Sequence, residues 1–116
     1  EPVQPVRSRS SELATAVVNL IANAIEALDE RGVIVVATGQ EDGGAWVEVA
    51  DDGPGMSPDV ERRVFEPFFT TKQEGTGLGL AMVYAFVQRH GGRVGLTTAP
   101  GEGTRIRLWF PVVAAP

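Results

Sequence analysis

Three glycines at every second position, Gly75, Gly77 and Gly79, stand directly before a segment with helical character, "LAMVYAFVQRH". Glycine in a helix interior costs about 1 kcal/mol relative to alanine, so the glycines indicate a loop that leads into the helix. Such a loop leaves backbone N–H groups pointing at one spot, where the helix dipole adds positive potential. The pattern predicts a phosphate site, with an ordinary flexible loop as the alternative. No strand immediately precedes the glycines, so they are not a dinucleotide-binding fingerprint.

The composition bounds the kind of protein. A chain of 116 residues can form one domain with its own apolar core. It has no cysteine, which excludes disulfides and thiolate metal sites. The net charge of −5 argues against a nucleic-acid partner, and no apolar run reaches the roughly 20 residues that span a bilayer. We expect a cytoplasmic domain over residues 11–111, with a linker remnant at 1–10 and a C-terminal tail at 112–116.

The order of periodic segments indicates the architecture. Apolar residues at helical spacing predict a helix that begins at a cap formed by Ser10 or Ser11 and ends before Gly32. Further along the chain, the patterns predict strands over 33–40, 45–53, 93–99 and 104–110, and helices over 58–64 and 78–90. This order suggests a helical layer on one face of a sheet.

Two polar residues are predicted to point into the core. Asp51 ends a strand in which it shares a face with Val47 and Val49. Thr104 likewise shares a face with the apolar residues of the last strand. An inward carboxylate is unusual and needs donors. Asp51 is either satisfied by turn amides or accepts a hydrogen bond from an amino group such as the exocyclic amine of adenine.

Asn19 and Asn23 lie one turn apart on the first helix, on a different face from its apolar stripe. Amide oxygens are hard, neutral ligands that suit Mg²⁺, which keeps several waters and shares phosphate oxygens. The alternative is a solvated helix surface. The pair is therefore a candidate magnesium site.

Five segments extend these observations to a family. They are "NLIANAIEAL", "DDGPGM", "VFEPFFTTK", "EGTGLGLAMV" and "GEGT", in that order. The chain resembles the ATP-binding catalytic domain of sensor histidine kinases, whose asparagine, glycine and phenylalanine boxes follow this order. The "NAIEAL" and "FEPFFTTK" segments resemble the nitrogen-regulation and hybrid-kinase branch. The resemblance implies an α/β fold, a two-layer α/β sandwich whose mixed, mostly antiparallel sheet is covered on one face by about three helices.

The resemblance also implies roles for individual residues. Asp51 would accept from the adenine amine, with Thr104 supporting it through water, and Asn23 would coordinate Mg²⁺ with Asn19 beside it. Lys72 would reach the β- or γ-phosphate, although a solvated loop lysine is the alternative. Residues 65–77 would form a lid over the nucleotide. The remaining nucleotide-binding residues would be Gly53 and Gly55 near the base, and Gly75, Thr76, Gly77, Leu78, Gly79 and Leu80 around the phosphates.

Two positions bear on the reaction. Related ATPases carry a glutamate four residues before the metal asparagine, where it orients water, and here the position is Asn19, which cannot act as a general base. Many histidine kinases have a basic residue three positions after the metal asparagine, and here it is Glu26, which weakens any phosphate contact there. The site should hold ATP without rapid hydrolysis, which favours a kinase over an ATPase.

The function implied is transfer of the γ-phosphoryl group of ATP to a histidine on a separate dimerisation domain, with a response regulator as the indirect partner. The only histidine of this chain, His90, stands before Gly91 at the end of a predicted helix, where it complements the helix dipole. We expect a monomer in isolation. The alternatives are an anti-sigma-factor-type serine kinase and a non-catalytic nucleotide-sensing module.

Overall fold

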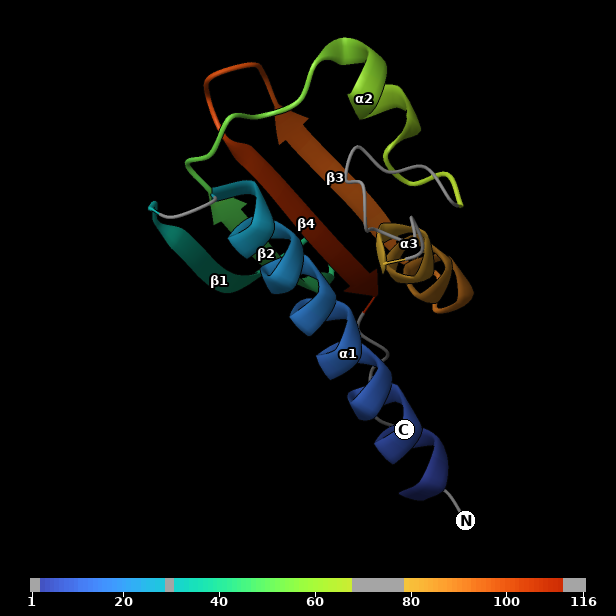
Figure 1. Ribbon diagram of the computed structural model, residues 1–116. Coiled ribbons are helices and arrows are strands. Elements are labelled where there is room, and N and C mark those ends of the chain that lie inside the picture. Colours follow the sequence, from blue (N-terminus) through green and yellow to red (C-terminus); the bar gives the residue numbers. More distant parts are fainter. Residues whose placement is uncertain (1–2, 29–30, 68–78, 112–116) are drawn as a thin grey trace.

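The computed structural model describes residues 3–28, 31–67 and 79–111. The elements follow in the order predicted from the sequence (Figure 1). They are α1 (Val3–Leu28), β1 (Ile34–Glu41), β2 (Gly44–Asp51), α2 (Pro58–Arg63), α3 (Gly79–Arg89), β3 (Arg93–Thr98) and β4 (Thr104–Pro111).

The four strands form one sheet in the order β1-β2-β4-β3. All three strand pairings are antiparallel. We expected a mixed, mostly antiparallel sheet, and the described sheet is instead entirely antiparallel. β1 and β2 are joined by the two-residue turn Asp42-Gly43, whose φ angles of 55° and 73° match the twist that favours tight hairpins. β4 lies between β2 and β3, which brings the end of β2 next to the start of β4.

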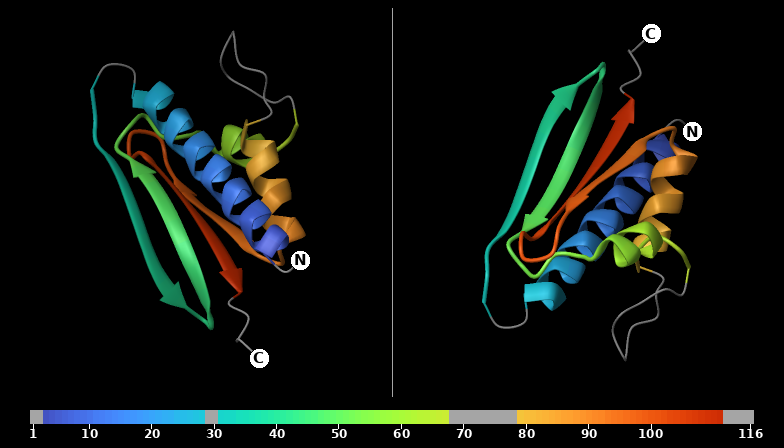
Figure 2. Two further views of the ribbon diagram at one scale, coloured as in Figure 1. Left: turned by 90° about the horizontal axis from the view of Figure 1, so that it is seen from below. Right: turned by 90° about the horizontal axis from the view of Figure 1, so that it is seen from above.

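Helices α1 and α3 lie side by side on one face of the sheet, as two further views show (Figure 2). The small helix α2 lies at one end of the sheet, begins at the cap Ser57 and contains no buried residue. Two helices rather than three therefore cover the sheet within the described residues.

The core lies between the two helices and the inner face of the sheet. Its buried apolar side chains are Ala16, Leu20 and Ala24 of α1, Val49 of β2, Leu80, Val83, Phe86 and Val87 of α3, and Ile106 and Leu108 of β4. The period-two alternation predicted for β2 and β4 is confirmed, because Val49, Ile106 and Leu108 face inward.

The predicted start of the first helix was wrong. α1 begins at Val3, and neither Ser10 nor Ser11 caps it. No glycine or proline interrupts residues 6–31, and Pro5 falls in the first turn, where the missing N–H costs no intrahelical bond. Residues 3–10 are therefore helical, while their assignment to a linker remains a prediction.

Candidate functional site

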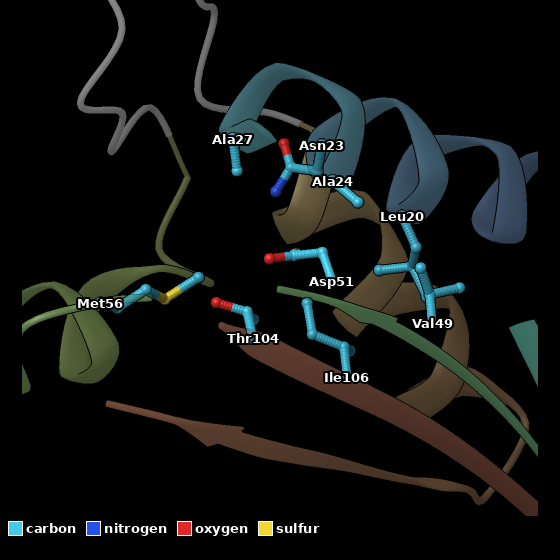
Figure 3. Close-up of a pocket in the computed structure, with 9 residues that line it drawn as sticks. All are labelled: Leu20, Asn23, Ala24, Ala27, Val49, Asp51, Met56, Thr104 and Ile106. Carbon is cyan, nitrogen blue, oxygen red and sulfur yellow. The ribbon is translucent and has the colours of Figure 1, made fainter. Parts of the chain in front are cut away.

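A cavity opens at the end of the sheet where β2 finishes and β4 begins (Figure 3). Asp51, the last residue of β2, is directly paired with Thr104, the first residue of β4. The cavity is lined by Leu20, Asn23, Ala24, Ala27, Val49, Asp51, Met56, Thr104 and Ile106. Its volume is about 40 Å³, which is the scale of one or two water molecules. A cavity of this size can hold only a small part of a larger ligand, and the rest would lie outside.

Three polar side chains point into the same space from three elements. Asn23 reaches it from α1, Asp51 from β2 and Thr104 from β4 (Figure 3). Asp51 Oδ1 accepts a hydrogen bond from the backbone N–H of Gly53 at 2.8 Å. A turn amide therefore satisfies part of the carboxylate, which is one of the two alternatives that the sequence analysis gave for Asp51. An ionised carboxylate offers about four acceptor positions, so capacity for a ligand remains.

The loop after β2 packs tightly against the turn between β3 and β4. Gly55 has φ of +73°, and a Cβ atom there would overlap the carbonyl oxygen of Ala99. At Gly53 a Cβ would lie 2.9 Å from Asp51 Oδ1. Gly55 is thus required by close approach within the protein itself, whereas a Cβ at Gly53 would displace only the end of the Asp51 side chain.

Thr98, the last residue of β3, is a part of the site that the sequence did not suggest. Its Oγ1 lies 2.9 Å from Met56 N, 2.9 Å from Gly103 O and 3.1 Å from Thr104 Oγ1. Met56, also unassigned from the sequence, lines the cavity. The "PGEG" turn predicted from the sequence would place Ala99 opposite Thr104, whereas the observed loop has five residues, 99–103, and Thr98 is the partner of Thr104.

Asn19 lies apart from the other predicted site residues. It lines a separate groove of about 280 Å³ between α1 and α3, together with Glu12, Thr15, Ala16, Met82, Val83, Ala85, Phe86 and Arg89. Asn19 and Asn23 are one turn apart, yet they border different depressions. The structure therefore brings Asn23 together with Asp51 and Thr104, and does not bring Asn19 into that cavity.

The predicted phosphate region is described only at its end. α3 begins at Gly79, where a Cβ atom would meet no heavy atom of the described residues within 4 Å. Leu80 follows with a buried side chain, which anchors the first turn of α3 to the core. The other residues predicted for this region, Lys72, Gly75, Thr76, Gly77 and Leu78, lie outside the described residues.

The predicted lid is described from Phe65 to Pro67 only. The ring of Phe65 stacks on Tyr84 of α3, with 5.5 Å between the ring centroids. Phe68 and Phe69, also predicted as anchors, lie outside the described residues. The start of this segment is thus attached to α3 and packs against the core.

His90 ties the end of α3 to α1. Its Nε2 lies 3.3 Å from Glu12 Oε1, and its ring packs edge-on against Phe86 at 4.8 Å. Arg89 donates to the other carboxylate oxygen of Glu12 at 2.7 Å. These contacts occupy His90 in joining two helices.

Metal binding would depend on few protein groups. Within residues 3–28, 31–67 and 79–111, no cluster of three or more histidine, aspartate or glutamate side chains could hold a metal ion. The cavity does contain the amide of Asn23, a hard oxygen donor of the kind that binds Mg²⁺ together with water and phosphate oxygens. Among the described helices, none has both the length and the apolar character needed to cross a membrane.

Residues 8–114 match the family described as "Histidine kinase-, DNA gyrase B-, and HSP90-like ATPase". The sensor histidine kinase ZraS of Escherichia coli O157:H7 is 40% identical over 107 residues, which cover 92% of this chain and 23% of ZraS. This chain therefore spans about a quarter of the length of that relative.

Solved structures agree with the sequence comparison. The mycobacterial sensor histidine kinase MprB superposes with a TM-score of 0.78 at 37% identity, covering 88% of this chain and 71% of the MprB chain. Full-length ShkA, solved in complex with AMPPNP, superposes with a TM-score of 0.79 at 33% identity, covering 90% of this chain and 22% of ShkA.

Proposed function

Because this chain belongs to the family of histidine kinase-, DNA gyrase B- and HSP90-like ATPases, we propose that it is the ATP-binding catalytic domain of a two-component sensor histidine kinase. It binds Mg-ATP and transfers the γ-phosphoryl group to a histidine on a separate dimerisation domain. From there a response regulator receives the phosphoryl group. The parent protein is a signalling kinase whose catalytic part acts in the cytoplasm.

The observation that carries this proposal is the pairing of Asp51 with Thr104, where β2 ends and β4 begins. Both side chains point into one cavity, and both can accept a hydrogen bond from the amino group of adenine. ShkA, which has a similar structure, was solved with AMPPNP, an adenine nucleotide. The base edge of ATP fits the small cavity, with the ribose and phosphates outside.

The phosphates extend from the cavity toward the start of α3. The N-terminus of this 11-residue helix offers N–H groups and positive potential to the phosphates, starting at Gly79 and Leu80. We assign the preceding residues Gly75, Thr76, Gly77 and Leu78 to the same cradle, and Lys72 to a contact with the β- or γ-phosphate. Asn23 contributes an amide oxygen to Mg²⁺, which would neutralise phosphate charge.

Phosphoryl transfer needs little covalent chemistry from the protein, so positioning and electrostatic stabilisation account for catalysis. In the sequence, Asn19 takes the position at which related ATPases carry a glutamate, and an amide cannot remove a proton from water. His90 is engaged with Glu12 and Phe86. The acceptor is therefore a histidine supplied from outside this domain.

Calorimetric titration of Mg-ATP into the domain tests the binding step. A single binding event without continuing heat supports a kinase domain that awaits its acceptor, whereas sustained heat after each injection means hydrolysis and contradicts the proposal. The matched variants are D51N and D52N, which remove the same charge from neighbouring positions. Asp52 accepts a hydrogen bond from the backbone N–H of Val33 at 2.9 Å and is not among the residues that line the cavity.

D51N should weaken ATP binding by at least about 10-fold, because hydrogen bonds to charged groups are worth about 1.5–3 kcal/mol. D52N should leave the affinity within about threefold of the original. Mixing the domain with the histidine-bearing domain of its parent and labelled ATP then tests transfer. Label on serine rather than histidine would favour the serine-kinase alternative, and binding without transfer would favour a nucleotide-sensing module.

A further inference from the structure

Thr98 occupies the junction of three segments that form the rim of the cavity. It ends β3 and is paired across the turn with Thr104, which begins β4. Its half-buried hydroxyl contacts the loop after β2 at Met56, the turn at Gly103 and the side chain of Thr104. One hydroxyl group thus connects the base of the cavity to the two loops beside it.

Counting protons fixes the direction of each of these hydrogen bonds. A threonine hydroxyl has one proton and two lone pairs. The carbonyl oxygen of Gly103 can only accept, so it takes the proton of Thr98 at 2.9 Å. The N–H of Met56 can only donate, so it occupies one lone pair of Thr98, also at 2.9 Å. The remaining lone pair faces Thr104 Oγ1 at 3.1 Å, and this contact is a hydrogen bond when Thr104 is the donor.

Thr104 has then used its only proton on Thr98, and its oxygen meets the cavity with lone pairs alone. Asp51, its direct cross-strand neighbour, also presents acceptors. The sheet side of the cavity therefore offers two acceptors from this pair. An exocyclic amine can donate one N–H to each of them, whereas a carbonyl oxygen at the same place would meet two sets of lone pairs.

We infer that Thr98 is a positioning residue that makes Thr104 an obligate acceptor and so selects an amino-purine over an oxo-purine. This inference rests on the proposed function, since it concerns the base of the proposed nucleotide. Thr98 acts through Thr104 and does not touch the ligand itself.

The test compares the affinities for Mg-ADP and for Mg-inosine diphosphate, which carries oxygen in place of the 6-amino group. The wild-type domain should bind ADP about 10- to 100-fold more tightly than inosine diphosphate. The 6-oxygen of inosine diphosphate would face the acceptors of Asp51 and Thr104, and these groups would lose their hydrogen-bond donor. T98V keeps the shape of the side chain but removes the hydroxyl, which frees the Thr104 proton to turn toward the ligand. We expect its ADP preference to fall at least about fivefold, while T98S, which keeps the hydroxyl, retains the preference.

A purely structural role for Thr98 gives a different result. T98V would then lower stability and weaken both nucleotides equally, and an unchanged preference overturns the inference. T104V removes the acceptor that Thr98 orients, so it should also lower the preference for ADP over inosine diphosphate. Adding T98V to T104V should then lower this preference no further. If T98V does not fold, T98A and T104V provide the same comparison. If the wild-type domain binds neither nucleotide, it is the proposed function that fails.

Discussion

The backbone of Gly103 lies against the carbonyl oxygen of Asp51, so closely that a Cβ atom on Gly103 would overlap that oxygen. Gly103 has φ of +79°, and Gly101 in the same turn has φ of +80°. A Cβ at Gly101 would meet no heavy atom of the described chain within 4 Å. The two glycines therefore share a backbone conformation but differ in their surroundings.

This difference yields the first prediction. G101A should lower the free energy of unfolding by about 1–2 kcal/mol, the cost of a left-handed conformation for a residue with a Cβ. G103A carries the same cost and must also displace the end of β2, so its loss should exceed that of G101A by at least about 1 kcal/mol. Urea denaturation measures both. G103A should also weaken ADP binding, because Asp51 moves, and equal stabilities for the two variants would contradict the close approach.

The core provides a second prediction from a matched pair of valines in helices. Val87 of α3 is 0% exposed, whereas Val18 of α1 is 61% exposed. V87A should lower the free energy of unfolding by about 1.5–3 kcal/mol, because it removes buried apolar surface and leaves a cavity. V18A should change it by less than about 0.5 kcal/mol, since alanine favours helices and little burial is lost. Thermal or urea unfolding measures the free energy of unfolding of both variants. Similar decreases in V87A and V18A would mean that α3 is not packed as described.

The outer face of the sheet gives a third prediction that separates stability from binding. The guanidinium of Arg107 lies 3.8 Å from the ring centroid of Trp46 and donates to Glu48 at 3.0 Å. Arg105 also faces Glu48, at 3.5 Å, with a largely exposed side chain. R107A should cost about 1–2 kcal/mol through the lost stacking and charged hydrogen bond, and R105A less than about 0.5 kcal/mol.

Neither arginine variant should change the affinity for ADP by more than about twofold, since this face is opposite to the cavity. Calorimetry on the folded variants checks this. A large loss of affinity in R107A would show that the two faces of the sheet are coupled.

The sequence predicted much of this fold because period-two alternation is a local signal. It identified the inner faces of β2 and β4, and with them the inward orientation of Asp51 and Thr104. The family predicted from the five segments is also confirmed. The adjacency of Asp51 and Thr104 depends on strand order, since β4 is inserted between β2 and β3. No local pattern encodes that insertion.

Two features could not be predicted for related reasons. The role of Thr98 depends on its hydrogen bonds to Met56, which is distant in the sequence, and to Gly103, which lies across the turn between β3 and β4. The start of α1 was misplaced because a serine that caps a helix and a serine inside one look the same in sequence. Only the absence of a helix breaker after Pro5 favoured the longer helix.

The last prediction concerns the choice between kinase and hydrolase. Asn19 lines the groove between α1 and α3 rather than the cavity with Asn23, yet it stands one turn before Asn23 on the same helix. N19E would introduce a carboxylate that can activate water, so basal ATP hydrolysis should rise at least about 10-fold, below the 10²–10⁴-fold of an optimised base. N19Q, which adds the same length without a base, should not raise it. Release of inorganic phosphate measures both variants. If N19E hydrolyses ATP no faster than N19Q, Asn19 belongs to the groove alone, and the slow turnover expected of this domain must have another cause.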